Sequence, residues 1–138
     1  MFLLDTDVVS ALRRPDRAPV GLLAWSAAAG REHHISAITL FELERGVGRL
    51  ERRDVAQAAM LRAWLDGSVL PTFQGRILPV DQRVARACAA LHTPDPRPLA
   101  DSLIAATAIV HGLTLVTRNV RDYAGTGAAV FNPWTAAD

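Results

Sequence analysis

The chain has 138 residues, half of them hydrophobic, and a formal net charge of +1 at pH 7. This length fits one ordinary domain, residues 1–138, with enough apolar side chains to bury a core, and the near-neutral charge excludes a polycation. The single cysteine, Cys88, excludes an internal disulfide and favours a reducing cytoplasm, while no apolar run reaches the ~20 residues of a membrane span.

Short apolar runs alternate with helical repeats along the chain. The strands are expected at residues 2–4, 33–36, 77–80, 113–116 and 128–131. The helices are expected at residues 8–14, 20–31, 39–53, 54–65, 82–91 and 98–111. Gly67, Pro71 and Gly75 are expected to interrupt the chain between the fourth helix and the third strand. This alternation predicts an α/β sandwich around a central parallel sheet, which binds ligands outside the carboxyl ends of its strands.

Four acids occupy special positions in this scheme. Asp5 ends the first strand, and Glu42 lies in the first turn of the helix that follows the second strand. Asp101 lies in the first turn of the helix before the 113–116 strand, and Asp122 lies just beyond that strand. The four carboxylates are therefore candidates for one edge of the sheet.

Carboxylates that share a pocket repel each other, and a hard divalent cation relieves this repulsion. Mg²⁺ and Mn²⁺ prefer carboxylate and water oxygens, and such an ion activates water for attack on a phosphodiester. Taken one at a time, the acids also have structural roles. Asp5 and Asp7 suit a helix cap, Glu42 and Asp101 complement helix dipoles, and Asp122 suits a turn. Only Asp5, directly after a buried strand, demands a partner by itself.

Four segments resemble, in order and spacing, the motifs of PIN domains, in particular the VapC-type toxins of bacterial toxin–antitoxin pairs and their FitB-like relatives. They are LLDTDVVS at 3–10, ITLFELERG at 38–46, ADSLIAATA at 100–108 and LVTRNVRDY at 115–123. The resemblance implies a PIN-like three-layer α/β/α sandwich and a metal-dependent endoribonuclease. It also implies RNA as substrate, a cognate antitoxin protein as partner and a homodimer.

The resemblance also assigns roles to individual residues. Asp5 and Asp101 would be the principal ligands of Mg²⁺ or Mn²⁺, and Glu42 would bind the metal or orient water. The fourth acid falls on Asp122 in some relatives and on the position of Asn119 in others, and we take Asp122 here. Thr117 could contact the site, and Asp7 would support it indirectly or cap the first helix.

Several other side chains have plainer interpretations. Glu44 lies two residues from Glu42 on one helix, so it is expected to point away from the site. Trp25, Trp64 and Trp134 are expected to anchor the core or an interface, not to form a base-stacking platform. The helix expected at residues 39–53, which carries Glu42, also carries a row of arginines that suits either a solvated face or phosphate contact, namely Arg45, Arg49, Arg52 and Arg53. Gly46 and Gly48 within it suggest close packing of another element.

Two other functions fit parts of the sequence. An Asp-Thr-Asp after the first strand is also found in phosphotransferases that form an aspartyl-phosphate. Those enzymes generally place a lysine beside the phosphate, and all 15 basic residues here are arginine. A PIN-like module that binds a partner without catalysis is the other alternative, but such a module would have no reason to hold four mutually repelling acids.

Overall fold

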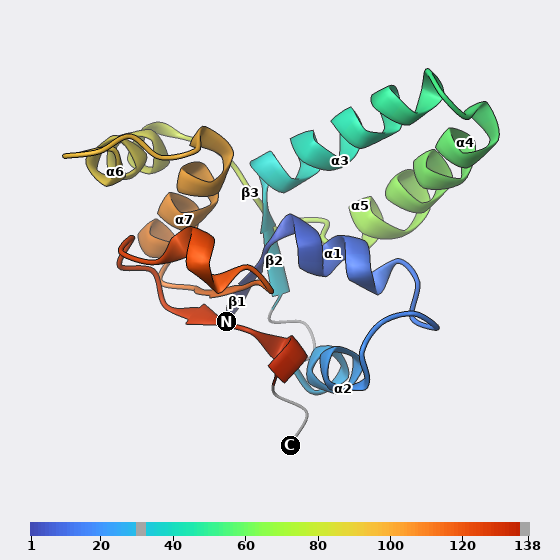
Figure 1. Ribbon diagram of the computed structural model, residues 1–138, viewed down its shortest axis with the longest axis horizontal. Coiled ribbons are helices and arrows are strands. Elements are labelled where there is room, and N and C mark those ends of the chain that lie inside the picture. The colour runs from blue at the N-terminus through green and yellow to red at the C-terminus, as the bar shows by residue number, and fades with distance from the viewer. Residues whose placement is uncertain (30–32, 136–138) are drawn as a thin grey trace.

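Five parallel strands form one sheet in the order β3-β2-β1-β4-β5. The computed structural model describes residues 1–29 and 33–135. The strands are β1 (Phe2–Leu4), β2 (His33–Ser36), β3 (Ile77–Leu78), β4 (Thr114–Val116) and β5 (Val130–Phe131). The predicted α/β fold with a central parallel sheet is confirmed, and β1 lies at its centre (Figure 1).

Helices cover both faces of this sheet. They are α1 (Thr6–Leu12), α2 (Val20–Ala29), α3 (Ala37–Glu51), α4 (Val55–Trp64), α5 (Leu70–Thr72), α6 (Gln82–Leu91) and α7 (Leu99–His111). Figure 1 shows α6 and α7 on one side of the strands, with α1, α2 and the α3–α5 segment on the other. No helix in the described ranges is both long and apolar enough to cross a membrane.

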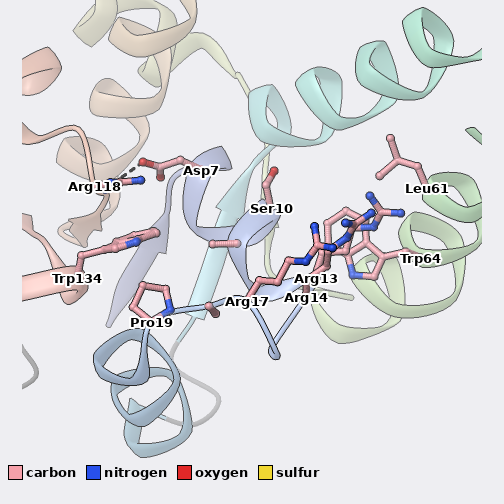
Figure 2. A pocket seen from close by; sticks show the side chains of 12 residues that line it. Asp7, Ser10, Arg13, Arg14, Arg17, Pro19, Leu61, Trp64, Arg118 and Trp134 are labelled. Carbon is pink, nitrogen blue, oxygen red and sulfur yellow. Dashed lines mark hydrogen bonds between the residues drawn. The ribbon is translucent and has the colours of Figure 1, made fainter. Parts of the chain in front are cut away.

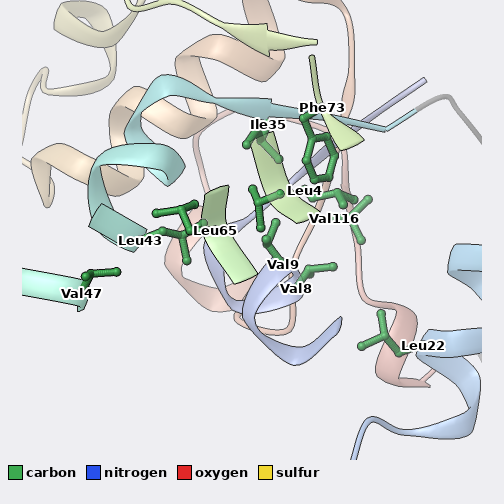
Figure 3. Packing of buried hydrophobic residues seen from close by; sticks show 11 residues of the cluster. Leu4, Val8, Val9, Leu22, Ile35, Leu43, Val47, Leu65, Phe73 and Val116 are labelled. Carbon is green, nitrogen blue, oxygen red and sulfur yellow. The ribbon is translucent and has the colours of Figure 1, made fainter. Parts of the chain in front are cut away.

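The two faces of the sheet bury different apolar clusters, because successive strand side chains point to opposite faces. Leu3 and Leu115 pack with Ile104 of α7. Leu4 and Val116, their neighbours in sequence, pack instead on the other face with residues of α1, α3 and the segment after α4 (Figure 3). Both central strands are therefore buried on both faces, as the continuous apolar runs predict.

Helix α3 begins two residues earlier than the sequence predicts. Ser36 is the last residue of β2, and its hydroxyl accepts a hydrogen bond from the backbone N–H of Ile38 at 3.0 Å. This cap starts the helix at Ala37 directly after the strand. The expectation that Glu42 lies in the first turn is therefore wrong, and Glu42 lies in the second turn, on the sixth residue of the helix.

The expected interruption after the fourth helix is also wrong at two of its three positions. The chain stays helical through Gly67 and Pro71, as a π-helical turn (η1, Leu65–Val69) that leads into α5. The backbone N–H of Leu70 bonds the carbonyl of Leu65, five residues back. The wider π turn allows the helix to continue where Pro71 has no N–H to donate.

Three predicted strands are shorter in the structure than in the sequence-based expectation, and β4 differs least, since it begins at Thr114, one residue later than expected. Strand β3 ends at Leu78, because Pro79 has no N–H for a sheet hydrogen bond. Strand β5 begins at Val130, two residues later than expected. The expected end of the second helix, at residues 30–31, lies outside the described residues.

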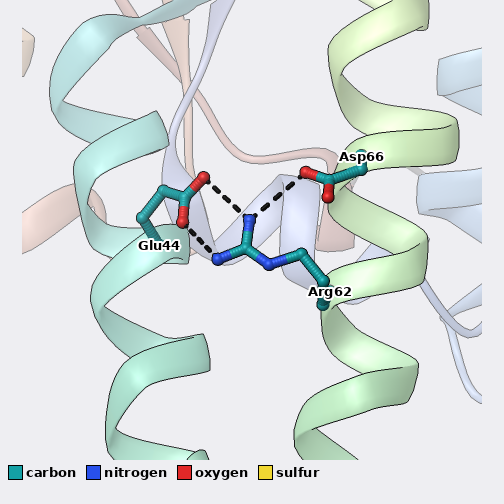
Figure 4. A network of polar contacts seen from close by, with 3 residues as sticks. All are labelled: Glu44, Arg62 and Asp66. Carbon is teal, nitrogen blue, oxygen red and sulfur yellow. Dashed lines mark hydrogen bonds and ion pairs between the residues drawn. The ribbon is translucent and has the colours of Figure 1, made fainter.

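Helices α3 and α4 form a hairpin that polar side chains hold together. The guanidinium of Arg62 on α4 donates two hydrogen bonds to the carboxylate of Glu44 on α3, at 2.7 and 3.0 Å. It donates a third to Asp66 at 3.2 Å (Figure 4). The hydrogen bond from Arg62 lowers the pKa of Glu44 below its usual value. Glu44 therefore points toward α4, which confirms that it does not belong with Glu42.

Candidate active site

Asp5 lies at the carboxyl end of the central strand, where β1 passes into α1. Its side chain is 7 % exposed. One carboxylate oxygen accepts the backbone N–H of Thr6 at 2.8 Å and caps α1. The other accepts the hydroxyls of Thr117 and Tyr123, each at 2.9 Å. Three donors from two ends of the chain therefore hold this carboxylate in one orientation.

Burial and hydrogen bonding have opposite effects on the pKa of Asp5. Burial raises the pKa of Asp5 above its usual value, and the negative charge of Glu42 raises it further, while the hydrogen bonds of Thr117 and Tyr123 favour the charged form. Burial, and then the charge of Asp5, raises the pKa of Tyr123 well above its usual value. The tyrosine hydroxyl therefore stays protonated, and it donates a hydrogen bond to Asp5.

Glu42 reaches the same edge from α3. The hydroxyl of Thr6, the residue after Asp5, donates to Glu42 Oε1 at 2.6 Å. The Thr6 oxygen also lies 3.0 Å from the hydroxyl of the buried Thr39, which must then be the donor, because the Thr6 proton is already used. Arg45 contributes a partly exposed ion pair to Glu42 at 3.8 Å. Thr6 thus links the second acid to the end of β1.

Asp101 lies in the first turn of α7, as predicted, and its carboxylate is partly buried. Burial raises the pKa of Asp101 above its usual value. Three negative charges raise it further, namely those of Asp5, Asp122 and Glu42. The other three predicted acids therefore lie within electrostatic reach of Asp101, although the four come from different parts of the chain.

Asp122 is the outermost of the four. It lies in a 3-10 turn (η2, Val120–Tyr123) after β4, and its side chain is exposed. The neighbouring Tyr123 turns inward to Asp5. Asp122 therefore adds charge to the site from its rim, while the next residue enters the buried network.

Asp7 forms a second polar cluster beside the first. One of its oxygens accepts the backbone N–H of Arg118 at 3.0 Å, and the side chains of Thr117 and Asn119 approach the same oxygen at 3.3 Å. Its other oxygen is buried and has no hydrogen-bond partner among the described residues. Burial, together with the charge of Asp5, raises the pKa of Asp7 to about 6. Asn119, the alternative to Asp122, thus donates to Asp7 in this structure.

The donor set suits a hard divalent cation in its chemistry. The acids offer only carboxylate oxygens, their mutual repulsion favours a cation, and Asp7 Oδ1 is a buried oxygen that no donor satisfies. Among the described residues, however, no three Asp, Glu, His or Cys side chains converge closely enough to hold a metal ion as they stand. The residues therefore fit a metal by charge and placement, and the ligand set is still a prediction.

Two residues of this network were not singled out from the sequence. Thr6 and Tyr123 both lie inside recognised motifs, and each is the direct neighbour of a predicted acid. Their hydroxyls contact residues 36 and 118 positions away. Their positions inside the motifs, each next to a predicted acid, are the signal that could have identified them.

A family model described as PIN domain matches residues 2–124 of the chain. This chain belongs to the PIN-domain family. The match includes all four acids and the hydroxyl residues that bind them, Thr6, Thr117 and Tyr123. Ribonucleases of the PIN-domain family generally depend on divalent metal ions.

Individual PIN proteins match over nearly the whole chain. Toxin FitB of Neisseria gonorrhoeae is 40% identical over 141 residues, which covers 97% of this chain and 99% of that protein. VapC ribonuclease Y4jK of Sinorhizobium fredii is 37% identical over 148 residues, covering 99% of this chain and all of that protein. The crystal structure of FitAcB from Neisseria gonorrhoeae has a TM-score of 0.87 at 38% identity and covers 98% of this chain and 99% of its own. The predicted PIN-like three-layer sandwich is thereby confirmed.

Proposed function

We propose that this PIN protein is a metal-dependent endoribonuclease, in which residues 1–138 form a single domain. The relatives named above are a toxin and a ribonuclease, and they are similar over the full chain. The observation that carries the proposal is the state of Asp101, a partly buried acid whose pKa is raised by burial and then by the charges of three acids from other elements. A cluster of this kind is unfavourable without a cation, so it indicates a purpose beyond folding.

In this proposal the four acids act as ligands and Asp5 is the fixed reference point of the site. Asp5 and Asp101 are the principal ligands, Glu42 binds the metal or orients water through the position that Thr6 gives it, and Asp122 completes the set from the rim. A bound Mg²⁺ or Mn²⁺ would lower the pKa of a water molecule and stabilise charge on the phosphoryl oxygens of RNA. Thr117 and Tyr123 both donate hydrogen bonds to Oδ2 of Asp5, which orients this carboxylate and favours its charged form.

RNA cleavage by the purified protein tests this function. We expect cleavage with Mn²⁺ or Mg²⁺ and none with EDTA. Asp5→Asn and Asp101→Asn should each lower the rate by at least about 100-fold, because each replaces a charged ligand with a neutral amide of nearly the same shape. Equal activity in EDTA, or in either variant, would rule out the mechanism. A folded wild-type protein that cleaves no RNA would favour the non-catalytic interaction module.

We further propose that the protein is the toxin of a toxin–antitoxin pair, that it acts as a homodimer, and that it works in the cytoplasm, where RNA is available. Support comes from the toxin to which it is similar along its full length. Expression of this chain alone is expected to slow bacterial growth, and co-expression of a small protein encoded by an adjacent gene should restore it. The Asp101→Asn variant is the control, and it should not slow growth. Normal growth despite abundant folded wild-type protein would contradict the toxin role.

A further inference from the structure

Asp101 and Asp122 reach the candidate site on two separate segments of the chain. Asp101 lies in the first turn of α7, directly after the loop at residues 92–98 that joins α6 to α7. Asp122 lies in η2, after β4, and Tyr123 beside it donates a hydrogen bond to Asp5. The relative position of the two acids therefore depends on how the loop is held against the segment that contains η2.

Arg97 in this loop connects the two segments. Its Nε atom donates a hydrogen bond to the carbonyl of Leu91, the last residue of α6, at 3.2 Å. Its Nη1 atom donates to the carbonyl of Ala124, directly after η2, at 3.1 Å. A guanidinium is planar and carries its donors in a fixed fork, so it sets the separation of the two carbonyls that it bridges. The loop before α7 is thereby joined to the turn that carries Asp122.

The side chain of Arg97 is more enclosed than its surroundings. Residues 93–96 of the loop are exposed, whereas Arg97 is half-buried. The carbonyl of Leu91 is one of those that a helix end leaves without an intrahelical partner, and Arg97 supplies its donor. Within the described part of the chain, Arg97 forms no ion pair. Its guanidinium therefore binds backbone carbonyls and not an acid.

The backbone after η2 leaves room for this guanidinium. A Cβ built on Gly125 would lie 3.0 Å from Nη2 of Arg97, closer than side chains ordinarily approach. The buried Thr126 closes the same turn, because its hydroxyl donates to the carbonyl of Tyr123 at 2.7 Å. The turn that Arg97 contacts is therefore the one that holds the backbone of Tyr123.

Tyr123 connects this turn to the acids. Its hydroxyl donates to Oδ2 of Asp5 at 2.9 Å. Burial raises the pKa of Asp101, and hydrogen bonding by Tyr123 opposes that rise, so the hydroxyl lies near both acids. A displacement of Tyr123 would therefore change the surroundings of both Asp5 and Asp101.

Two other arginines near the acids have different partners. Arg45 forms an ion pair with an acid of its own helix, Glu42, at 3.8 Å. The side chain of Arg118 lies over the ring of Trp134, 5.8 Å from the ring centre (Figure 2). Neither side chain bridges two of the segments that carry the acids, so the contacts of Arg97 are of a different kind.

We propose that Arg97 is a positioning residue, which holds Asp101 in place relative to Asp122 so that both bind one divalent cation. The inference rests on the proposed metal-dependent function and adds to it a residue outside the four acids. Charge alone predicts an effect of the opposite sign, since removal of a cation near the acids should strengthen the binding of another cation. A positioning role predicts that loss of Arg97 weakens it.

Calorimetric titration with Mn²⁺ at pH 7 compares Arg97→Leu with the wild type. We expect the variant to bind about fivefold more weakly, less than the roughly 10–100-fold loss typical of a residue that bonds a metal ligand directly, because Arg97 acts through the backbone. Arg83→Leu is the matched control. Arg83 donates to the carbonyl of Val110, near the other end of α7, at 3.3 Å, so this change removes the same charge and a similar hydrogen bond. It should leave the affinity unchanged.

Tyr123 supplies a second readout, since it is the only tyrosine in the chain. Protein labelled with fluorotyrosine gives a fluorine NMR signal from this residue alone. In the metal-free protein we expect Arg97→Leu to move this signal and Arg83→Leu to leave it in place. A role of Arg97 in stability alone would lower the melting temperature without moving the signal of the folded protein.

Two glycines between η2 and β5 test the same contact from its other side. Gly125→Ala places a Cβ against Arg97, so it should weaken Mn²⁺ binding and move the fluorine signal as Arg97→Leu does. Gly127→Ala imposes similar backbone strain, since its φ is +84° against +79° for Gly125, but its Cβ has no described atom within 4 Å. It should lower the unfolding free energy without changing Mn²⁺ affinity. Thermal melting verifies that each variant is folded.

Unchanged Mn²⁺ affinity in Arg97→Leu would overturn the proposal. Tighter binding would also overturn it, in favour of a purely electrostatic effect, as would an equal loss in Arg83→Leu. Failure of the proposed function would look different, because the wild-type protein would then bind no Mn²⁺. The fluorine signal would still test the contact in that case, and an unchanged signal in Arg97→Leu would refute the positioning role.

Discussion

At the scale of single residues, the site is built around a carboxylate that the fold buries at some cost. Asp5 is 7 % exposed, and its Oδ2 atom accepts hydrogen bonds from the hydroxyls of Thr117 and Tyr123. A buried charge without such donors would be strongly destabilising. The acid network therefore lowers the unfolding free energy of the metal-free protein and favours cation binding, and both effects can be measured.

The pH dependence of stability follows from Asp7, whose pKa rises from 3.8 to about 6 on folding. Between these values the unfolded chain releases a proton that the folded protein keeps, so the metal-free protein loses stability as pH rises from about 4 to 6. We expect Asp7→Asn to flatten this part of the profile and to stabilise the protein at pH 7. The gain should be about 1–2 kcal/mol, less than the full shift implies, because solvent screens the half-buried carboxyl.

Urea unfolding in EDTA at several pH values gives this profile directly. Asp81→Asn is a suitable control, because it changes an acid that caps α6. Asp5, whose pKa is also raised, should leave a residual slope of the same sign. An Asp7→Asn profile that parallels the wild type would contradict the assignment.

The acids could be predicted at this scale, and their partners could not. Asp5 and Asp101 are placed by local rules, since one ends a strand and the other starts a helix. Tyr123 and Thr6 act through contacts with residues far away in sequence, and no local pattern specifies those contacts. Asp122, chosen over Asn119, is still a prediction, with its electrostatic effect on Asp101 in its favour.

At the scale of secondary structure, the end of α7 has a specific requirement for glycine. Gly112 has a φ of +64° and ends the helix before β4. A Cβ there would meet no neighbouring atom, so only the backbone opposes it. We expect Gly112→Ala to cost about 1–2 kcal/mol of unfolding free energy.

Gly48→Ala is the matched control, in the interior of α3. No atom lies within 4 Å of its added Cβ, and its φ is not positive. This variant should gain about 0.5–1 kcal/mol. Among the described residues of the chain, nothing packs closely on Gly48, and Gly46 makes only an ordinary contact with Leu61 at 4.0 Å, so the close packing expected there is not found within the domain. Equal stability of Gly112→Ala and the wild type would contradict the account of the helix end.

Element types could be predicted from hydrophobic spacing, and some boundaries could not. The helix through Leu91 and the helix end at Gly112 follow from recognisable caps. Ser36 lies in the strand, as predicted, but its hydroxyl also starts α3, which the sequence-based boundary at Thr39 misses. Pro71 predicts a break, because no local pattern in the sequence indicates the π turn that accommodates it.

At the scale of the whole molecule, the order of strands determines the site. Because β1 lies between β2 and β4, the carboxyl ends of all three meet at one edge, and with them Asp5, Ser36 and Thr117. Parallel pairing was predictable from the alternation of strands and helices. The arginine–tryptophan pairs beside α1 were not, since Arg13 meets Trp64, and Arg118 meets Trp134, only when the chain is folded.

The same topology makes Asp101 the point at which the four acids interact. Calorimetric titration of the purified protein with Mn²⁺ at pH 7 measures the cation binding that this interaction predicts. We expect saturable binding that Asp101→Asn weakens at least about tenfold and that Asp81→Asn leaves unchanged. Asp122→Asn should weaken binding more than Asn119→Ala does. Mn²⁺ binding of equal strength in the wild type and in Asp101→Asn would contradict the four-acid site.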